Sequence, residues 1–279
     1  MFEDKIIRIF PRRTNATPID DNVVINRPPG LFDEAEKIDI SVAFTYDLTI
    51  AENLFNQWRH VATTEIGGPA LNKTEGEFVP GKYLKSGYVI TSRGCPNRCW
   101  FCSVWKRQPV IKELQIKDGW NILDDNLLAC SPGHIIKVFE MLKRQDHKPR
   151  FTGGLEAKLI TKDIALKLKE LKPESMYFAY DTPDDYEPLV NAGKILKDVG
   201  FGKSHDLMCY VLFGYKGDTL EKALQRMIEV IIAGFMPFAM RYRDKNGVYL
   251  TDRKYNLFQR EWTRPEIVAS NMKKIKGIK

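Results

Sequence analysis

The stretch from Leu207 to Met240, LMCYVLFGYKGDTLEKALQRMIEVIIAGFMPFAM, predicts a strand, a helix and a second strand. Leu207–Phe213 and Met236–Met240 are short apolar runs, which are typical of buried strands. The intervening Asp218–Ile232 carries apolar residues at helical spacing, and Gly234 follows where helices commonly end in glycine. A strand, a helix and a strand in this order form the repeating unit of a parallel sheet covered by helices.

The same alternation begins at Tyr88, with a period of roughly 30 residues per unit. The four earlier predicted strands are Tyr88–Ser92, Trp120–Leu123, Arg150–Thr152 and Met176–Tyr180. The predicted helices between them are Gly133–Gln145, Thr161–Leu171 and Glu187–Val199. Six strands in this pattern predict an α/β protein with a partial (β/α)6 TIM-like barrel. The active site of a barrel of this kind lies at the carboxyl ends of its strands.

The first part of the chain has a different pattern. Ile38–Thr45 is predicted to be a strand and Leu48–Val61 a helix, which indicates a small α/β lobe. Asn72–Lys82, with its Gly, Glu, Lys and Pro residues, is a predicted linker. We therefore divide the chain into a small α/β lobe at 1–84, a partial barrel at 85–245 and a basic C-terminal extension at 246–279.

The composition limits the compartment and the partners. Of 279 residues, 43% are hydrophobic and 28% are charged, as in ordinary globular proteins. The apolar runs are all shorter than the roughly 20 residues that cross a bilayer, and the charged N-terminus lacks a secretory signal, so we expect a cytoplasmic protein without a membrane partner. The net charge of +7 is compatible with nucleic acid, but Lys and Arg are scattered and no dedicated binding domain is evident.

Three of the five cysteines occur in the segment Cys95-Pro-Asn-Arg-Cys99-Trp-Phe-Cys102, with the spacing CxxxCxxC, directly after a predicted strand. Such crowding favours metal ligation in a reducing compartment over disulfides. Three thiolates leave one iron of a 4Fe-4S cube without a protein ligand and therefore open to substrate chemistry. A structural zinc site usually has four ligands at CxxC-type spacing, and no further Cys or His follows at a suitable short distance. The nearest candidates, Cys130 and His134, would leave all four ligands on one irregular segment, so zinc is disfavoured.

The pattern CxxxCxΦC, with Phe101 at the aromatic position Φ, resembles the signature of the radical S-adenosylmethionine (SAM) superfamily. The resemblance extends over about Tyr83 to Asp244, because 121–126, 151–156 and 211–214 fall where that family carries its later strand motifs. It implies that Cys95, Cys99 and Cys102 hold a 4Fe-4S cluster. It further implies reductive cleavage of SAM to a 5'-deoxyadenosyl radical, hydrogen abstraction from an unidentified substrate, and an electron donor such as flavodoxin or ferredoxin.

The resemblance also implies positions that bind SAM. Gly153 and Gly154 correspond to the glycine pair whose backbone approaches the methionine amino group, and glycine permits that approach. The acidic residue of that motif is here Glu156, one place later than in the family. Phe101 corresponds to the residue whose backbone faces adenine.

Two charged residues at strand ends complete the implied SAM site. Asp181 is the candidate for the ribose hydroxyls, with a helix or turn cap before Pro183 as the alternative. Arg241 is the candidate for the SAM carboxylate, with an ordinary ion pair as the alternative. For Asp124 and Asp125 a place facing substrate or a loop cap is favoured over metal binding.

The N-terminal lobe is similar to the final portion of the cobalamin-binding domain of one radical SAM subgroup. It is too short for the full domain and lacks a DxHxxG motif, which disfavours cobalamin-dependent methyl transfer. It also lacks cysteine, which disfavours a methylthiotransferase. Two alternatives stay open: a radical SAM enzyme that modifies nucleic acid, and a non-catalytic iron-sulfur protein.

Overall fold

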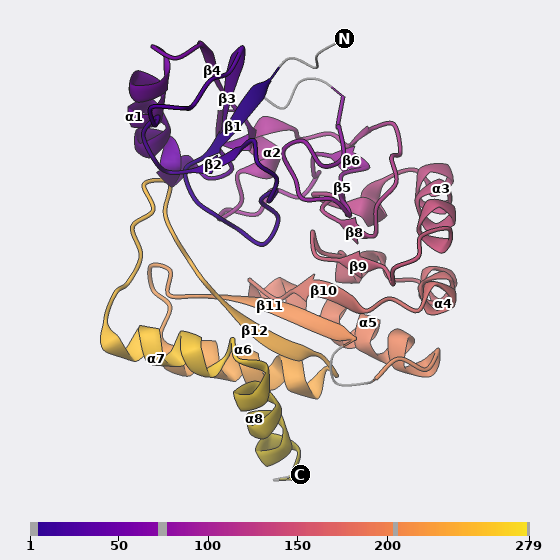
Figure 1. Ribbon diagram of the computed structural model, residues 1–279. Helices are drawn as coiled ribbons and strands as arrows, with labels where there is room; N and C mark the ends of the chain where they lie inside the picture. Colours follow the sequence, from indigo (N-terminus) through magenta and orange to yellow (C-terminus); the bar gives the residue numbers. More distant parts are fainter. Residues whose placement is uncertain (1–4, 72–76, 203–205, 278–279) are drawn as a thin grey trace. The chain divides into compact units, whose positions relative to one another are not determined.

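A computed structural model describes residues 5–71, 77–202 and 206–277. The chain divides into two compact units (Figure 1). The first comprises the residues up to Tyr88 together with Asp244–Val248, and the second comprises Val89–Arg243 and Tyr249–Lys279. The predicted linker Asn72–Lys82 falls partly outside the described residues.

The first unit is built on a parallel sheet with the strand order β2-β1-β3-β4. Its elements are β1 (Ile6–Phe10), β2 (Val23–Ile25), β3 (Lys37–Ser41), β4 (Thr63–Gly67) and α1 (Leu48–Trp58). Ile9, Ile38 and Ile40 of the central strands are buried in one core with Trp58 of α1. The predicted strand ends at Ser41 instead of Thr45, because Thr45–Asp47 forms a turn of 3-10 helix that leads into α1.

The second unit contains a six-stranded sheet with the order β12-β11-β10-β9-β8-β5. The strands from β8 to β12 pair in parallel, each with the next one along the chain. Their bounds are β5 (Tyr88–Val89), β8 (Asn121–Ile122), β9 (Arg150–Phe151), β10 (Ser175–Ala179), β11 (Leu207–Phe213) and β12 (Met236–Arg241). The α/β class with parallel strands is therefore confirmed.

Helices connect the parallel strands, as the apolar periodicity predicts. They are α3 (Pro132–Lys143), α4 (Lys162–Leu171), α5 (Tyr186–Asp198) and α6 (Leu220–Ile232). Each of these helices packs against the next, and α6 lies on β11 and β12 (Figure 1). Side-chain oxygens of Ser131, Thr161 and Thr219 accept backbone hydrogen bonds at the starts of α3, α4 and α6, which satisfies amides that have no partner within the helix.

The predicted strand Tyr88–Ser92 is two strands in the structure. The chain leaves the six-stranded sheet after Val89 and then forms an antiparallel pair between β6 (Ser92–Arg93) and β7 (Lys112–Glu113). The short helix α2 (Val104–Arg107) lies in the loop between them, and α7 (Arg253–Glu261) and α8 (Pro265–Gly277) follow β12. Over the described ranges no helix has the length and apolar character needed to cross a membrane.

Candidate functional site

The cysteine segment lies in the loop that the β6–β7 pair closes. The backbone amide of Cys95 donates to the carbonyl oxygen of Gln108 at 3.1 Å, which ties the start of the loop to its end. Gly94 has a φ of +95°, and a Cβ there would clash with the carbonyl oxygen of Val110. Both features require glycine at the position directly before Cys95.

Two aspartates that follow β8 accept hydrogen bonds from the residues that lead into this loop. Asp124 is buried, and its carboxylate accepts hydrogen bonds from the Thr91 backbone amide at 2.6 Å and from the Ser92 hydroxyl at 2.7 Å. The carboxylate of Asp125 accepts from the backbone amide of Gly94 at 2.8 Å. The structure therefore gives both residues the loop-capping role that the sequence left open against one facing substrate.

The cysteines are free thiols, and each is half-buried. The backbone amide of Cys102 donates to the carbonyl oxygen of Cys99 at 3.1 Å, and the indole of Trp105 donates to the same oxygen at 2.9 Å. The Sγ of Cys102 accepts from the backbone amide of Val104 at 3.4 Å. These bonds fold the segment into a tight turn without using the sulfur of Cys99.

Burial disfavours the ionised form of the thiols in this loop. Burial raises the pKa of Cys99, and repulsion from Cys102 raises it further. Burial likewise raises the pKa of Cys102. Metal ligation requires thiolates, so iron cations would offset the burial and the mutual repulsion that keep these groups protonated.

Across the part of the chain that the structure describes, no group of three or more His, Cys, Asp or Glu side chains is arranged to hold a metal ion. A 4Fe-4S cube makes a different demand, because each thiolate ligates a separate iron of the cluster. Three free, half-buried thiols on one short loop, close enough to interact through their charges, fit that demand.

Asn126 joins the cysteine loop to the loop that follows β9. Its side chain is buried, with 4% of the residue exposed, and its Nδ2 donates to Cys95 Sγ at 3.5 Å. The same nitrogen donates to Glu156 Oε2 at 2.6 Å. Its Oδ1 is buried and has no hydrogen-bond partner among the described residues. The sequence places Asn126 at a strand end but does not indicate these contacts.

Glu156, predicted to contact SAM, lies in this network beside Cys95. Besides accepting from Asn126, its carboxylate pairs with Lys158 at 2.5 Å. Lys158 also donates to Asn97 Oδ1, inside the cysteine segment, at 3.0 Å. Oε2 of Glu156 is thus hydrogen-bonded to Asn126, whereas the buried Oε1 lies beside Lys158 as an ion pair and has no hydrogen-bond partner among the described residues.

The two glycines predicted to contact SAM have different surroundings. A Cβ on Gly153 would clash with the backbone of Asp124, so this glycine permits close packing of the β9 end against the β8 end. Gly154 has a φ of +101°, and a Cβ there would meet nothing closer than the carbonyl oxygen of Tyr177 at 3.9 Å. Of the pair, Gly154 therefore has the more open backbone.

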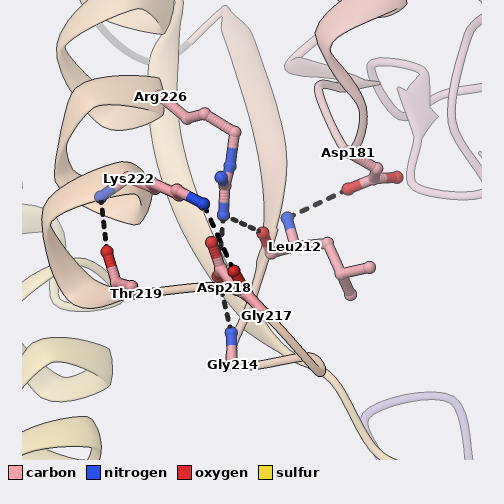
Figure 2. Close-up of polar contacts among 8 residues, drawn as sticks. All are labelled: Asp181, Leu212, Gly214, Gly217, Asp218, Thr219, Lys222 and Arg226. Carbon is pink, nitrogen blue, oxygen red and sulfur yellow. Dashed lines mark hydrogen bonds and ion pairs between the residues drawn. The ribbon is translucent and has the colours of Figure 1, made fainter.

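Asp181 follows β10, and its carboxylate accepts from the backbone amide of Leu212 at 3.0 Å (Figure 2). Burial raises its pKa to about 7. The predicted turn cap at this point is formed by Thr182 and Asp185 instead, because the Asp185 carboxylate accepts from the backbone amides of Asp181 and Thr182.

Arg241, predicted to pair with the SAM carboxylate, is held by the first turn of α7 and by Leu250 before it. Its guanidinium donates to the Asn256 side chain at 2.7 Å and to the carbonyl oxygens of Leu250 and Tyr255 at 3.1 and 2.6 Å. Burial lowers its pKa. Its Nε is buried and has no hydrogen-bond partner among the described residues.

Aromatic rings gather beside the cysteine loop. Trp100 is 51% exposed and makes an edge contact with Phe101 at 5.4 Å between centroids. It also contacts Tyr215, after β11, at 5.2 Å and Tyr242, after β12, at 5.5 Å. Trp100 thus links the cysteine loop to two strand ends that follow far along the sequence.

A buried ion pair at the end of β11 was not predicted. Arg226 of α6 pairs with Asp218 at 2.9 Å and donates to the carbonyl oxygen of Leu212 at 2.9 Å (Figure 2). Asp218 also accepts from the backbone amide of Gly214 at 2.9 Å. The backbone of Leu212 therefore connects two carboxylates: its amide donates to Asp181, and its carbonyl oxygen accepts from Arg226, the partner of Asp218 (Figure 2).

Comparison with protein families finds no family model that matches the chain, and comparison with curated proteins finds no significant match.

Proposed function

We propose that the chain is a radical SAM enzyme in which Cys95, Cys99 and Cys102 ligate a 4Fe-4S cluster. The observation that carries the proposal is the placement of three free thiols, spaced CxxxCxxC, on one loop that the β6–β7 pair closes after the chain leaves β5, the first strand of a largely parallel sheet. The proposal includes a partial (β/α)6 barrel, which the sequential strand order supports. Ligands in α/β folds of this kind bind at the carboxyl ends of the strands.

The chain's own residues would position the cofactors. When bound, the cluster supplies the electron that cleaves SAM reductively, and the electron would come from a flavodoxin or ferredoxin. Asp124 and Asp125 hold the loop that presents the thiols. The open backbone at Gly154 is the proposed contact for the methionine amino group, and Asp181 is the proposed contact for the ribose.

Two of the other implied SAM contacts, Glu156 and Arg241, require a side chain to move, and the third, Phe101, uses its backbone. Glu156 and Arg241 would each exchange a protein partner for SAM, since the groups that they contact now belong to the chain itself. Phe101 would act through its backbone, because its ring packs against Trp100.

Anaerobic reconstitution of the full chain tests the proposal. We expect about four iron and four sulfide per chain and, with dithionite, conversion of SAM to 5'-deoxyadenosine and methionine. Replacing Cys95, Cys99 or Cys102 by Ala should abolish both results, whereas Cys209→Ala, at a fully buried thiol outside the loop, is the matched control. Zinc in place of iron, or a reduced cluster that leaves SAM intact, would overturn the proposal.

A further inference from the structure

The orientation of the Asn126 amide is fixed by its neighbours. A carboxylate can only accept hydrogen bonds, so the group that faces Glu156 Oε2 at 2.6 Å must be the NH2 group. The same NH2 group lies 3.5 Å from Cys95 Sγ, within the range for a hydrogen bond to sulfur. Asn126 therefore presents a donor, and not its carbonyl oxygen, to the cysteine.

The Asn126 donor is held in place by Glu156, which is itself held by Lys158. Glu156 accepts from Asn126 and pairs with Lys158, and Lys158 donates to Asn97 between the first two cysteines of the motif. Asn126 is 4% exposed and Glu156 is half-buried, so water competes weakly for the bond between them. Asn126, Glu156 and Lys158 therefore connect Cys95 to Asn97 of the same segment.

We propose that Asn126 is a positioning residue that raises the reduction potential of the cluster through its hydrogen bond to Cys95, an inference that depends on the proposed function. One-electron reduction adds negative charge to the cluster and its thiolate ligands. A fixed N–H donor stabilises the more negative state, and hydrogen bonds to the sulfurs are among the factors that set cluster potentials. Loss of the donor therefore makes the cluster harder to reduce.

Asn126 is the informative position because its donor belongs to a side chain. The hydrogen bond to Cys102 Sγ comes from the backbone amide of Val104, which a substitution at Val104 would leave in place. Asn126→Leu removes the donor at similar volume. Asn126→Asp also removes the NH2 donor, and because its carboxyl would lie beside that of Glu156, one of the two holds a proton and the net charge of the pair stays that of Glu156 alone. The potential should therefore fall below that of wild type in both Asn126 variants.

A second buried asparagine provides the matched control. Asn121 is 3% exposed, lies on β8, and accepts from the Thr152 hydroxyl at 2.5 Å without a contact to a cysteine among the described residues. Asn121→Leu is therefore the same substitution at a similarly buried amide. A general effect of losing an amide would appear in both variants, and an effect on the cluster only at Asn126.

The experiment is a redox titration of the reconstituted full chain, followed by the electron paramagnetic resonance signal of the reduced cluster. At a fixed potential, the ratio of reduced to oxidised cluster should be about tenfold lower in Asn126→Leu than in wild type, which is about 59 mV for one electron. It should be lowered in Asn126→Asp as well and unchanged in Asn121→Leu. These results would support the assignment without any measurement of SAM cleavage.

Other outcomes overturn it separately from the proposed function. An unchanged ratio in both Asn126 variants, or an equal shift in Asn121→Leu, would show that the amide does not act on the cluster. If Asn126→Leu takes up no cluster, Asn126→Asp decides the matter. Failure of both to assemble the cluster would make Asn126 an assembly residue and overturn the role in tuning. Absence of a cluster in the wild-type chain would instead overturn the proposed function.

Discussion

The carboxylate of Asp124 accepts two hydrogen bonds from Thr91, one from the backbone amide and one from the hydroxyl, each at 2.6 Å. Thr91 lies between the end of β5 and the start of β6, so this pair fixes the point at which the chain leaves the six-stranded sheet. Asp124 is 1% exposed, and its carboxylate therefore acts as an internal anchor for the cysteine loop.

Asp124→Ala should lower the free energy of unfolding by about 3 kcal/mol, because buried donors on Thr91 and Ser92 would lose their acceptor. Urea unfolding of the cluster-free chain, followed by circular dichroism, measures this loss. Asp125→Ala is the control, since Asp125 is half-buried and accepts from the Gly94 amide, and it should cost about 1 kcal/mol. Equal losses would contradict the anchoring role of Asp124.

Gly153→Ala should be destabilising by about 1 to 3 kcal/mol, because the added methyl would clash with the backbone of Asp124, which cannot move aside as a side chain can. The matched variant is Gly133→Ala in α3, where a Cβ meets nothing within 4 Å. It should be neutral or stabilising by up to about 1 kcal/mol. Thermal unfolding of both variants decides the comparison, and a neutral Gly153→Ala would rule out the close packing.

The regular helices and the long strands were predictable because their signals are local. Leu220–Ile232 forms α6 where the helical spacing predicts it, and β11 and β12 follow their apolar runs. The buried apolar residues of α6 are Ala223, Met227, Val230 and Ile231, whereas Leu224, which the spacing places on the apolar stripe, is 41% exposed. The sequence does not show which of Asp218 and Thr219 caps α6. In the structure Thr219 is the cap and Asp218 pairs with the buried Arg226. Both side chains carry oxygens that can accept a hydrogen bond at a helix start, so residue type alone does not separate the two roles.

Features that depend on distant pairing were missed. The β6–β7 pair joins Arg93 to Lys112 across the whole cysteine loop, and strands of two residues carry no periodicity. Asn126 meets Glu156 because two neighbouring parallel strands end at the same edge, 30 positions apart in the chain. Such contacts follow from the register of the sheet, which a single sequence does not fix.

The Cys130→Ser, Cys209→Ser double variant should keep its iron content and its SAM cleavage. Both thiols are buried, burial raises the pKa of Cys130 to about 11, and burial raises that of Cys209 as well. Two buried thiols on separate elements cannot supply the three ligands of a second cluster, and buried cysteines commonly act as small hydrophobic groups. Iron analysis after reconstitution checks this, with the wild-type chain beside it. Iron reduced to about half would indicate a second cluster and would restore sulfur transfer as a candidate activity.

Asp181→Asn should remove part of the pH dependence of stability. Burial raises the pKa of Asp181 from 3.8 to about 7 in the folded chain, so the folded state holds this proton more tightly than the unfolded state. The resulting stabilisation is complete below about pH 4 and is lost as the pH rises through about 7. Asparagine mimics the protonated group and can still accept from the Leu212 amide, so the variant should gain stability over wild type, by on the order of 2 to 4 kcal/mol, between pH 4 and 7.5. Urea unfolding at several pH values gives the free energy of unfolding against pH for wild type and Asp181→Asn. Asp184→Asn, at an exposed neighbour, is the control and should keep the pH dependence of wild type. Parallel curves for wild type and Asp181→Asn would show that Asp181 ionises normally, and its carboxylate would then be charged at neutral pH in the proposed ribose site.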